Sequence, residues 1–373
     1  MRITFLTASE SWGGTELHTL AVARQLVERG HAVHLVQLGH ELYARHGGAL
    51  LPTDVVLQQL PRGRDLERAD WERLLATDAG IVVHVKGGFG LSWPLLDRVA
   101  MRRRRVMHRI EHLVPLQRTW RQRLSPRAVL RARWHREAAA RILAITEIGL
   151  ERLVRDHGYD RSRIAVITNG IDTQRFQFDG VQRDAMRRNL GIGVDDFVFG
   201  TVTRLAPVKR IDRMLRAFAA LPAGPQHTRL VIAGDGPDQA ELRSLAGQLG
   251  IDGRCHWLGS STQVVPILAG LDAFLLTSRT ESVSYALLEA MAMELPVVAM
   301  SVDGVPLVMR DQVYGRLTDV SEATFSAAMA EVRAWSADRR ALAGAAARAH
   351  VVKHHDGQRQ AALVADWVLE GGA

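Results

Sequence analysis

Short apolar runs alternate with amphipathic helical patterns along the chain, and the alternation forms two blocks. In the first block the predicted buried strands are RITFL, AVHLVQL, IVVHV, RRVMHRI, RILAIT and RIAVIT. In the second they are FVFGTVTRL, TRLVIAG, CHWLG, AFLLTS and PVVAM. Helical patterns such as TELHTLAVARQLVERG and RIDRMLRAFAAL separate these runs. This order predicts two doubly wound α/β domains, each built on a parallel sheet.

Polar residues interrupt the pattern at about 175–190, so we place the domain boundary there. We predict one Rossmann-like domain over residues 1–178 and a second over 179–356. A C-terminal helix over about 357–373 is expected to pack back on the first domain. Ligands of open α/β sheets bind beyond the carboxyl ends of the strands, so two facing domains are expected to share one central cleft.

The composition of the 373 residues fits two packed cores, since 47% of them are hydrophobic. Cys255 is the single cysteine, so we expect no internal disulfide and a reducing compartment. The N-terminal stretch lacks the features of a signal peptide, and no apolar run approaches the roughly 18 residues of a spanning helix. The expected location is the cytoplasm, either in solution or peripheral at the cytoplasmic face of the inner membrane.

The excess positive charge lies in the first half, where residues 1–178 hold 28 of the 48 Lys and Arg but 18 of the 40 Asp and Glu. The stretch Arg102–Arg141 is the richest in arginine, and Trp120 and Trp134 interleave with its charges. One interpretation is a solvated helical face. The other is a docking surface for an anionic membrane or a phosphorylated partner.

Two carboxylates flank a predicted helix start in the sequence TSRTESVSYALLEAMAMELPVVAM. A helix that begins near Ser284 leaves Glu281 before its N-terminus and Glu289 one to two turns inside it. Its sheet-facing residues are predicted to be Leu287, Leu288, Met291 and Ala292. A helix N-terminus favours anions and carboxylates accept hydrogen bonds from hydroxyls, so this arrangement suits a nucleotide sugar.

Arg204 and Lys209 lie in GTVTRLAPVKRID, on one loop after a predicted strand. Two cations at a strand end can neutralise a diphosphate, although a surface loop with incidental charges explains them equally well. In TASESWGGTE, Gly13 and Gly14 allow close backbone approach to a ligand, or form a plain tight turn. The chain contains no D-x-D pair and no Walker loop, so we expect no metal and no other cofactor.

Strand ends in the first half supply a third group of candidates. His112 ends RRVMHRIEH and is predicted to project into the cleft, and His108 takes that place if the strand ends early. His84 and Lys86 end another strand and are weak candidates for contact with an acceptor. For each histidine, a structural role is the competing interpretation.

Taken in order, the motifs resemble glycosyltransferase family four, the retaining group with the GT-B fold. The resemblance covers nearly the whole chain and rests on GGTELHTLAVARQLVERGHAVHLV, NGIDTQRF, TRLAPVKRIDRMLRAF, IAGDGPDQAELRSLA, ESVSYALLEAMAMELPVVA and VDGVPLVM. It implies that the first domain binds the acceptor and the second the nucleotide-sugar donor. Its departures are at Ser284, Ala286, Arg210 and Glu294, where the family usually has glycine or proline.

The resemblance also implies roles for individual residues. Glu281 is similar to the carboxylate that binds hydroxyls of the donor sugar, and Glu289 to the one that binds the ribose. Arg204 and Lys209 are similar to the diphosphate clamp. The residues expected to line the sugar between the two glutamates are Ser282, Ser284, Tyr285 and Ala286.

In the first domain, Gly14, with Gly13 beside it, is similar to the loop glycine near the phosphates. His112 is similar to the strand-end histidine near the reacting sugar. His112, Arg204, Lys209 and Glu281 are therefore the expected catalytic group.

The function expected from these observations is transfer of a hexose, with retention, from a nucleotide diphosphate to a glycan hydroxyl. A UDP-sugar is the favoured donor, and GDP-mannose is the alternative. The preferred acceptor is lipid-linked or phosphorylated, as in lipopolysaccharide core or surface polysaccharide synthesis, and no nucleic-acid partner is expected. A transferase for a small soluble acceptor and a nucleotide-sugar binding protein without turnover remain as alternatives.

Overall fold

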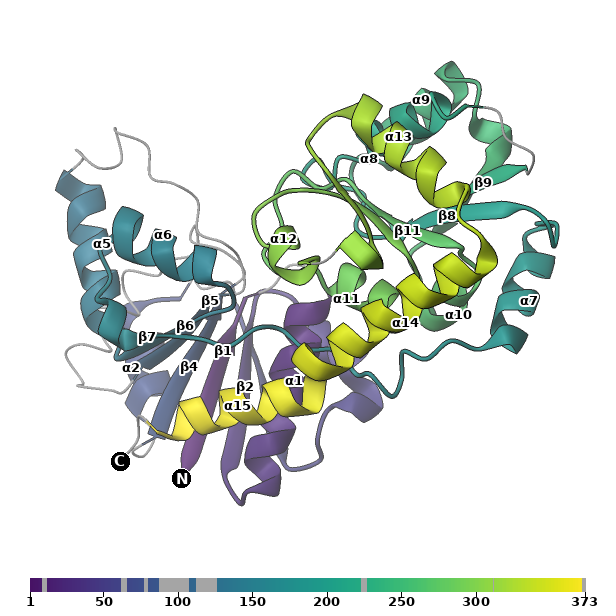
Figure 1. The fold of residues 1–373 in the computed structure, drawn as a ribbon. Coiled ribbons are helices and arrows are strands. Elements are labelled where there is room, and N and C mark those ends of the chain that lie inside the picture. Colours follow the sequence, from purple (N-terminus) through teal and green to yellow (C-terminus); the bar gives the residue numbers. More distant parts are fainter. Residues whose placement is uncertain are drawn as a thin grey trace. The chain divides into compact units, whose positions relative to one another are not determined.

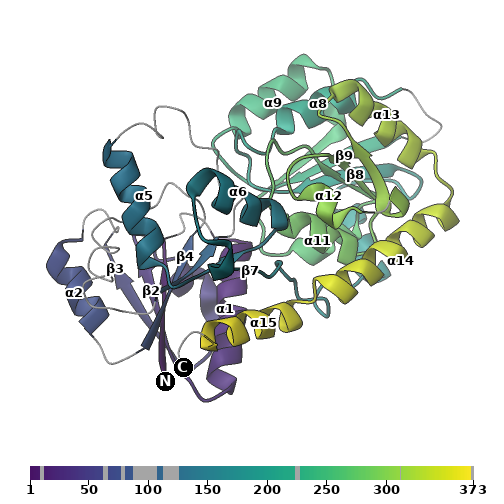
Figure 2. The same ribbon diagram turned by 60° about the vertical axis from the view of Figure 1, so that its left-hand side comes forward.

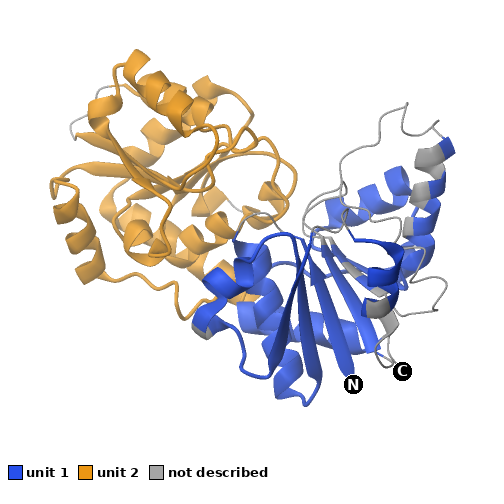
Figure 3. Cartoon of the chain, turned by 180° about the vertical axis from the view of Figure 1, so that it is seen from behind, with its two compact units in different colours: residues 1–170, 357–373 blue, residues 171–356 orange. Residues whose placement is uncertain are grey.

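The computed structural model describes residues 1–8, 12–61, 66–76, 80–86, 107–111, 126–222, 227–310 and 312–370. The chain divides into two compact units, shown in two colours in Figure 3. Unit 1 comprises Met1–Gly170 and Gly357–Ala373, and unit 2 comprises Ile171–Asp356.

Unit 1 contains a seven-stranded sheet in the order β3-β2-β1-β4-β5-β6-β7, in which all neighbouring strands are parallel (Figure 1). The strands are β1 (Arg2–Thr7), β2 (Ala32–Leu38), β3 (Val55–Leu60), β4 (Gly80–Lys86), β5 (Met107–Glu111), β6 (Arg141–Ala144) and β7 (Ile164–Val166). The helices are α1 (Gly14–Glu28), α2 (Arg68–Ala76), α5 (Pro126–Ala138), α6 (Glu147–His157) and α15 (Gly357–Leu369). The described part of unit 1 also has a π-helical turn (Tyr43–Gly47) and short 3-10 turns (Gly48–Leu50 and Arg161–Arg163).

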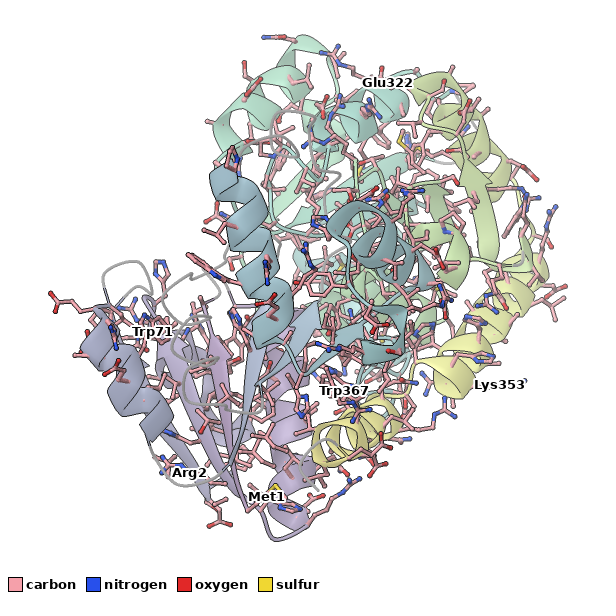
Figure 4. All side chains as sticks on the ribbon, turned by 90° about the vertical axis from the view of Figure 1, so that its left-hand side faces the viewer. Met1, Arg2, Trp71, Glu322, Lys353 and Trp367 are labelled. Carbon is pink, nitrogen blue, oxygen red and sulfur yellow. The ribbon has the colours of Figure 1, made fainter. Side chains whose placement is uncertain are left out.

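Helices cover both faces of this sheet because its central strands are apolar on both sides. Ile3 and Phe5 of β1 pack in one core with α1 and α15, whereas Leu6 packs in another with Trp71 of α2. Figure 4 labels Trp71 on α2 and Trp367 on α15, and both side chains are buried. The C-terminal helix α15 therefore belongs to the core of unit 1, beside α1.

Unit 2 contains a six-stranded parallel sheet in the order β10-β9-β8-β11-β12-β13. Its neighbouring strands β8 and β9 are labelled in Figure 2. The strands are β8 (Phe197–Val202), β9 (Thr228–Ala233), β10 (Cys255–Gly259), β11 (Ala273–Leu276), β12 (Val297–Met300) and β13 (Gly315–Thr318). The helices are α7 (Gly180–Asn189), α8 (Ile211–Ala219), α9 (Gln239–Gln248), α10 (Val264–Ala269), α11 (Tyr285–Ala292), α12 (Val305–Val308), α13 (Glu322–Arg333) and α14 (Ala337–His354). Two short 3-10 turns lie at Asp252–Arg254 and Gln312–Tyr314.

Alternate residues of the central strand β8 enter two cores on opposite faces of the sheet. Phe197 and Phe199 pack with α8 and α13, whereas Val198 packs with α10 and α11. This doubly wound arrangement confirms the predicted fold class of two parallel-sheet α/β domains.

The boundary between the units lies at residue 171, eight residues before the predicted start of the second domain at 179. Ile171 forms a bridge with Asp356, and the Thr173 hydroxyl donates a hydrogen bond to that carboxylate at 2.7 Å. Phe176 is buried in the core of unit 2. The boundary was predicted from the polar residues at about 175–190, but the buried Ile171 and Phe176 attach the residues before 179 to unit 2.

No helix in the described part of the chain combines the length and the apolar character needed to cross a membrane.

Candidate functional site

The candidate site of unit 2 is built on loops that follow three neighbouring strands and on the start of helix α11. The loop after β8 carries Arg204 and Lys209, the loop after β11 carries Glu281, and the loop after β12 carries Gly304. Strand β11 pairs with both β8 and β12. Because all three strands are parallel, their carboxyl ends meet at one edge of the sheet, where ligands of such sheets bind.

Lys209 and Glu281 are in direct contact at this edge. The Lys209 Nζ lies 2.6 Å from Oε1 of Glu281, and the Ser278 hydroxyl donates to the same oxygen at 2.7 Å. The side chain of Lys209 is 25% exposed and that of Glu281 is 10% exposed. The structure thus brings together a cation and a carboxylate that we predicted as separate parts of one site.

Hydrogen bonds also fasten the backbones of the β8 and β11 loops. The Arg279 N–H donates to the Val208 carbonyl at 2.7 Å. The Thr277 hydroxyl lies 3.2 Å from the Lys209 carbonyl and 3.0 Å from the Arg210 carbonyl. The position of Lys209 therefore depends on the end of β11 as well as on its own loop.

The loop after β12 supports Glu281 from the other side. The Gly304 N–H donates to the Glu281 carbonyl at 2.9 Å, and Thr280 donates to the Asp303 carboxylate. A Cβ atom on Gly304 would lie 1.5 Å from the Ser282 carbonyl oxygen, so this position requires glycine. We did not single out Thr280, Asp303 and Gly304 from the sequence; the VDGVPLVM stretch within the resemblance was the available signal.

Helix α11 begins where the sequence predicts. Ser284 is its N-cap, and the Ser284 hydroxyl accepts a hydrogen bond from the Leu287 N–H at 3.4 Å. The four residues predicted to face the sheet are all buried: Leu287, Leu288, Met291 and Ala292. Of the four residues expected to line the sugar, Ser282 and Ser284 are buried, and Tyr285 and Ala286 are partly buried.

Glu289 lies in the second turn of α11 and is partly buried. Burial raises the pKa of its carboxyl to about 7, and the nearby charge of Arg175 opposes this rise. The ionisation of Glu289 therefore falls near neutral pH.

Arg204 differs from Lys209 because its side chain is exposed. Among the described residues it forms no ion pair within 4.0 Å, unlike Lys209. Its backbone is nevertheless fixed: the Leu205 N–H donates to the Asp235 carbonyl at 2.9 Å, and a Cβ on Gly236 would lie 2.2 Å from the Leu205 carbonyl oxygen. The glycine turn after β9 thus positions the loop that carries Arg204.

In unit 1, Gly13 is the N-cap of α1 and Gly14 is the first residue of that helix. Gly13 has φ of −176°, an extended conformation open to any residue, and a Cβ there would lie 3.8 Å from the Glu16 carboxylate. The fold of unit 1 therefore does not itself require glycine at residue 13. A role in contact with a ligand stays a prediction for both glycines.

The structure corrects the alternative placement of His108 in the cleft. His108 is fully buried, and its ring centroid lies 5.1 Å from that of Trp367 on α15. Burial lowers its pKa to about 4. Side chains alternate between the faces of a strand, and that of His108 points to the face that α15 covers.

The other candidates of unit 1 are less informative. His84 is buried within β4, a position that does not favour direct contact with an acceptor. Lys86 ends the same strand, and its side chain lies outside the described part of the structure. His112 and Trp120 also lie outside the described residues.

About half of the Arg102–Arg141 stretch lies outside the described residues, but the side chains of three of its arginines are described and have partners within unit 1. Arg133 pairs with Glu137 at 2.6 Å, and Arg136 donates to the His157 carbonyl at 3.1 Å. Arg141 donates to the Trp367 carbonyl of α15 at 2.7 Å. These three side chains contribute to the structure of unit 1.

Two family models match the chain in consecutive segments. The model described as Glycosyltransferase Family 4 matches residues 12–175, and the model described as Glycosyl transferases group 1 matches residues 182–349. The segments lie in unit 1 and unit 2 respectively, apart from the few residues at the boundary.

Among similar sequences, the D-inositol 3-phosphate glycosyltransferase of Mycolicibacterium smegmatis is 36% identical over 191 residues, which is 49% of this chain and 42% of that protein. The chain thus matches less than half the length of this relative. Among similar structures, that of Anabaena HepE in complex with UDP has a TM-score of 0.82 at 20% identity, covering 99% of this chain and 100% of that one. That of WaaG, a glycosyltransferase involved in lipopolysaccharide biosynthesis, has a TM-score of 0.77 at 18% identity, covering 98% and 99%. With its two matching family models and its GT-B fold, the chain belongs to glycosyltransferase family four.

Proposed function

We propose that this chain transfers a hexose from a nucleotide diphosphate to a hydroxyl of a glycan acceptor, with retention of anomeric configuration. A UDP-sugar is the favoured donor and GDP-mannose the alternative. The observation that carries the proposal is the contact of Lys209, Ser278 and Glu281 at the carboxyl ends of β8 and β11, beside the N-terminus of α11.

These groups fit the chemistry of sugar transfer from a diphosphate. Negative charge develops on the leaving diphosphate, and Lys209, the exposed Arg204 and the N–H groups at the start of α11 would stabilise it. Glu281 would accept hydrogen bonds from sugar hydroxyls, and Glu289 from the ribose. In a retaining reaction of this kind, the diphosphate itself takes the acceptor proton on the face that it leaves, and no metal is needed.

The comparisons support the donor and suggest the kind of acceptor. Solved structures of HepE contain UDP and UDP-glucose, and the Mycolicibacterium relative is named for a phosphorylated acceptor. A lipid-linked or phosphorylated glycan bound by unit 1 is therefore the proposed acceptor. The arginine-rich stretch would then dock at the cytoplasmic face of an anionic membrane.

Thermal unfolding in the presence of a nucleotide-sugar panel tests the proposal. A ligand that binds only the folded chain raises its Tm, so UDP-glucose, UDP-galactose or GDP-mannose at about 100 times its Kd is expected to add roughly 2.7 kcal/mol of stability. The matching free sugars serve as controls. A panel in which no nucleotide or nucleotide sugar shifts the Tm contradicts the proposal.

A further inference from the structure

The carboxylate of Glu281 has two partners on a single oxygen. Lys209 and Ser278 both contact Oε1, at 2.6 and 2.7 Å. Within the described residues, no hydrogen bond reaches Oε2, which leaves this oxygen available for a ligand hydroxyl. The two partners differ because the Lys209 ammonium also attracts phosphate, whereas the Ser278 hydroxyl is held close to Glu281 within the same loop.

Binding of a diphosphate would draw Lys209 toward the negative charge of the ligand. Glu281 would then lose part of its attraction to the ammonium at the moment when the sugar needs a fixed acceptor oxygen. The Ser278 hydroxyl is then the remaining hydrogen-bond partner of Glu281 among the described residues, and it lies three residues from Glu281 at the end of β11.

The neighbouring residue, Thr277, contacts the backbone of the loop that carries Lys209. Its hydroxyl lies 3.0 Å from the Arg210 carbonyl and 3.2 Å from that of Lys209. Thr277 and Ser278 are each 1% exposed. Two consecutive buried hydroxyls thus reach two different loops, one with the predicted diphosphate cation and one with the predicted sugar carboxylate.

We infer that Ser278 and Thr277 are positioning residues with separate tasks, an inference that rests on the proposed function. Ser278 keeps Glu281 oriented toward the donor sugar after Lys209 has turned to the diphosphate. Thr277 fixes the backbone from which Lys209 reaches the diphosphate. Loss of Ser278 therefore affects recognition of the sugar, and loss of Thr277 affects recognition of the diphosphate.

The separation of these tasks distinguishes the inference from a general structural role. A hydroxyl that only stabilises the fold would lower the Tm and weaken the binding of every ligand alike. If the inference is correct, Ser278→Ala binds the nucleoside diphosphate within about twofold of native affinity and binds the nucleotide sugar about tenfold more weakly, the range expected for one hydrogen bond to a charged group. Thr277→Val weakens both ligands by a similar factor, because both contain the diphosphate, while its Tm stays close to native.

The test is titration calorimetry of native protein and variants with UDP and UDP-glucose, and with GDP and GDP-mannose. Analysis uses the nucleotide pair that the native protein binds. Ser278→Thr and Thr277→Ser retain the hydroxyls and are expected to restore native affinities. Matched controls are Ser162→Ala, which removes a hydroxyl 2.8 Å from the Asp160 carboxylate in unit 1, and Thr318→Val, which removes a hydroxyl 2.9 Å from the Asp319 carbonyl at the end of β13.

Equal losses for nucleoside diphosphate and nucleotide sugar in Ser278→Ala, or native affinity for both, overturn the inference while the proposed function stands. Failure of Ser278→Thr to restore binding of the nucleotide sugar also overturns the inference. If the native protein binds neither nucleotide nor nucleotide sugar, the proposed function fails, and the inference fails with it.

Discussion

The Lys209 ammonium lies 2.6 Å from the Glu281 carboxylate, although the two residues are 72 positions apart in the chain. The contact joins the loop after β8 to the loop after β11, two strands that are neighbours in the sheet. In the proposed function, the two groups bind different parts of one ligand. Their mutual contact keeps both side chains within the site before the ligand arrives. When the ligand binds, its diphosphate competes with Glu281 for Lys209.

Glu289 should make stability depend on pH. Its pKa is about 7 in the folded chain against an ordinary value of 4.5, so the unfolded chain releases this proton first as pH rises. The free energy of unfolding therefore falls as the pH rises from about 4.5 to 7, and this full penalty remains above pH 7. Glu289→Gln removes the penalty and should be more stable than native at pH 8 by on the order of 1–3 kcal/mol.

Urea unfolding of native protein and Glu289→Gln at pH 4.5 and pH 8 measures this effect. The variant's advantage should be much smaller at pH 4.5, and Glu241→Gln on the exposed side of α9 should show no such pH dependence. An advantage of equal size at both pH values would place the pKa of Glu289 in its ordinary range.

Glu294 has φ of 62°, in the left-handed region that disfavours residues with a Cβ. Its carboxylate lies 4.0 Å from Arg348 and is 45% exposed, so that pair contributes little. Glu294→Gly should raise the free energy of unfolding by about 0.5–1 kcal/mol, because relief of the strain exceeds the entropy that glycine adds to the unfolded chain. Denaturant unfolding checks this, with Glu294→Ala as control. A glycine variant no more stable than the alanine variant contradicts the strain argument.

Transfer should not require a divalent metal, since the sequence contains no D-x-D pair and Lys209 already supplies a cation at the site. Initial rates of nucleoside diphosphate release should stay within about twofold when EDTA is in excess, because the loss of an essential charge-stabilising group lowers kcat by roughly 10² or more. Loss of activity with EDTA that magnesium or manganese restores would reveal a metal site.

The arginine-rich stretch should bind anionic membranes in a salt-dependent way. Each basic residue near such a surface contributes about 1 kcal/mol, and salt screens the attraction. The variant replaces four arginines by glutamine: Arg118, Arg121, Arg123 and Arg127. Native protein should sediment with anionic vesicles at low salt, less at high salt and not with neutral vesicles, and the variant should remain in the supernatant. The prediction is wrong if the native protein stays in the supernatant at low salt and the variant is fully active on the natural acceptor. The arginine-rich stretch is then only a solvated face.

The sequence predicted the buried strands well because a parallel strand covered on both faces consists almost entirely of apolar residues. It missed β3, where Val56 is 62% exposed, and the short β13, whose sequence is GRLT. Both lie at the edge of their sheets, where one side lacks a neighbouring strand and the apolar signal weakens.

The sequence was enough to place the candidate residues of unit 2 on their loops, but it did not predict the contacts between them. The Lys209–Glu281 pair depends on β8 lying next to β11, an order that local patterns do not contain. The requirement for glycine at residue 304 depends on the approach of a second loop. The error at His108 has a similar origin, because strand periodicity gives two faces but not the one that the distant helix α15 covers.

The role of Lys209 is tested most directly by the rate at which Lys209→Ala releases nucleoside diphosphate from the nucleotide sugar that stabilises the native chain. We expect this rate to fall by roughly 10²–10³-fold, because a cation is lost where negative charge develops, while the Tm remains close to native. Lys353→Ala, an exposed lysine of α14 labelled in Figure 4, should keep the native rate. A near-native rate in Lys209→Ala would show that Lys209 does not stabilise the leaving diphosphate.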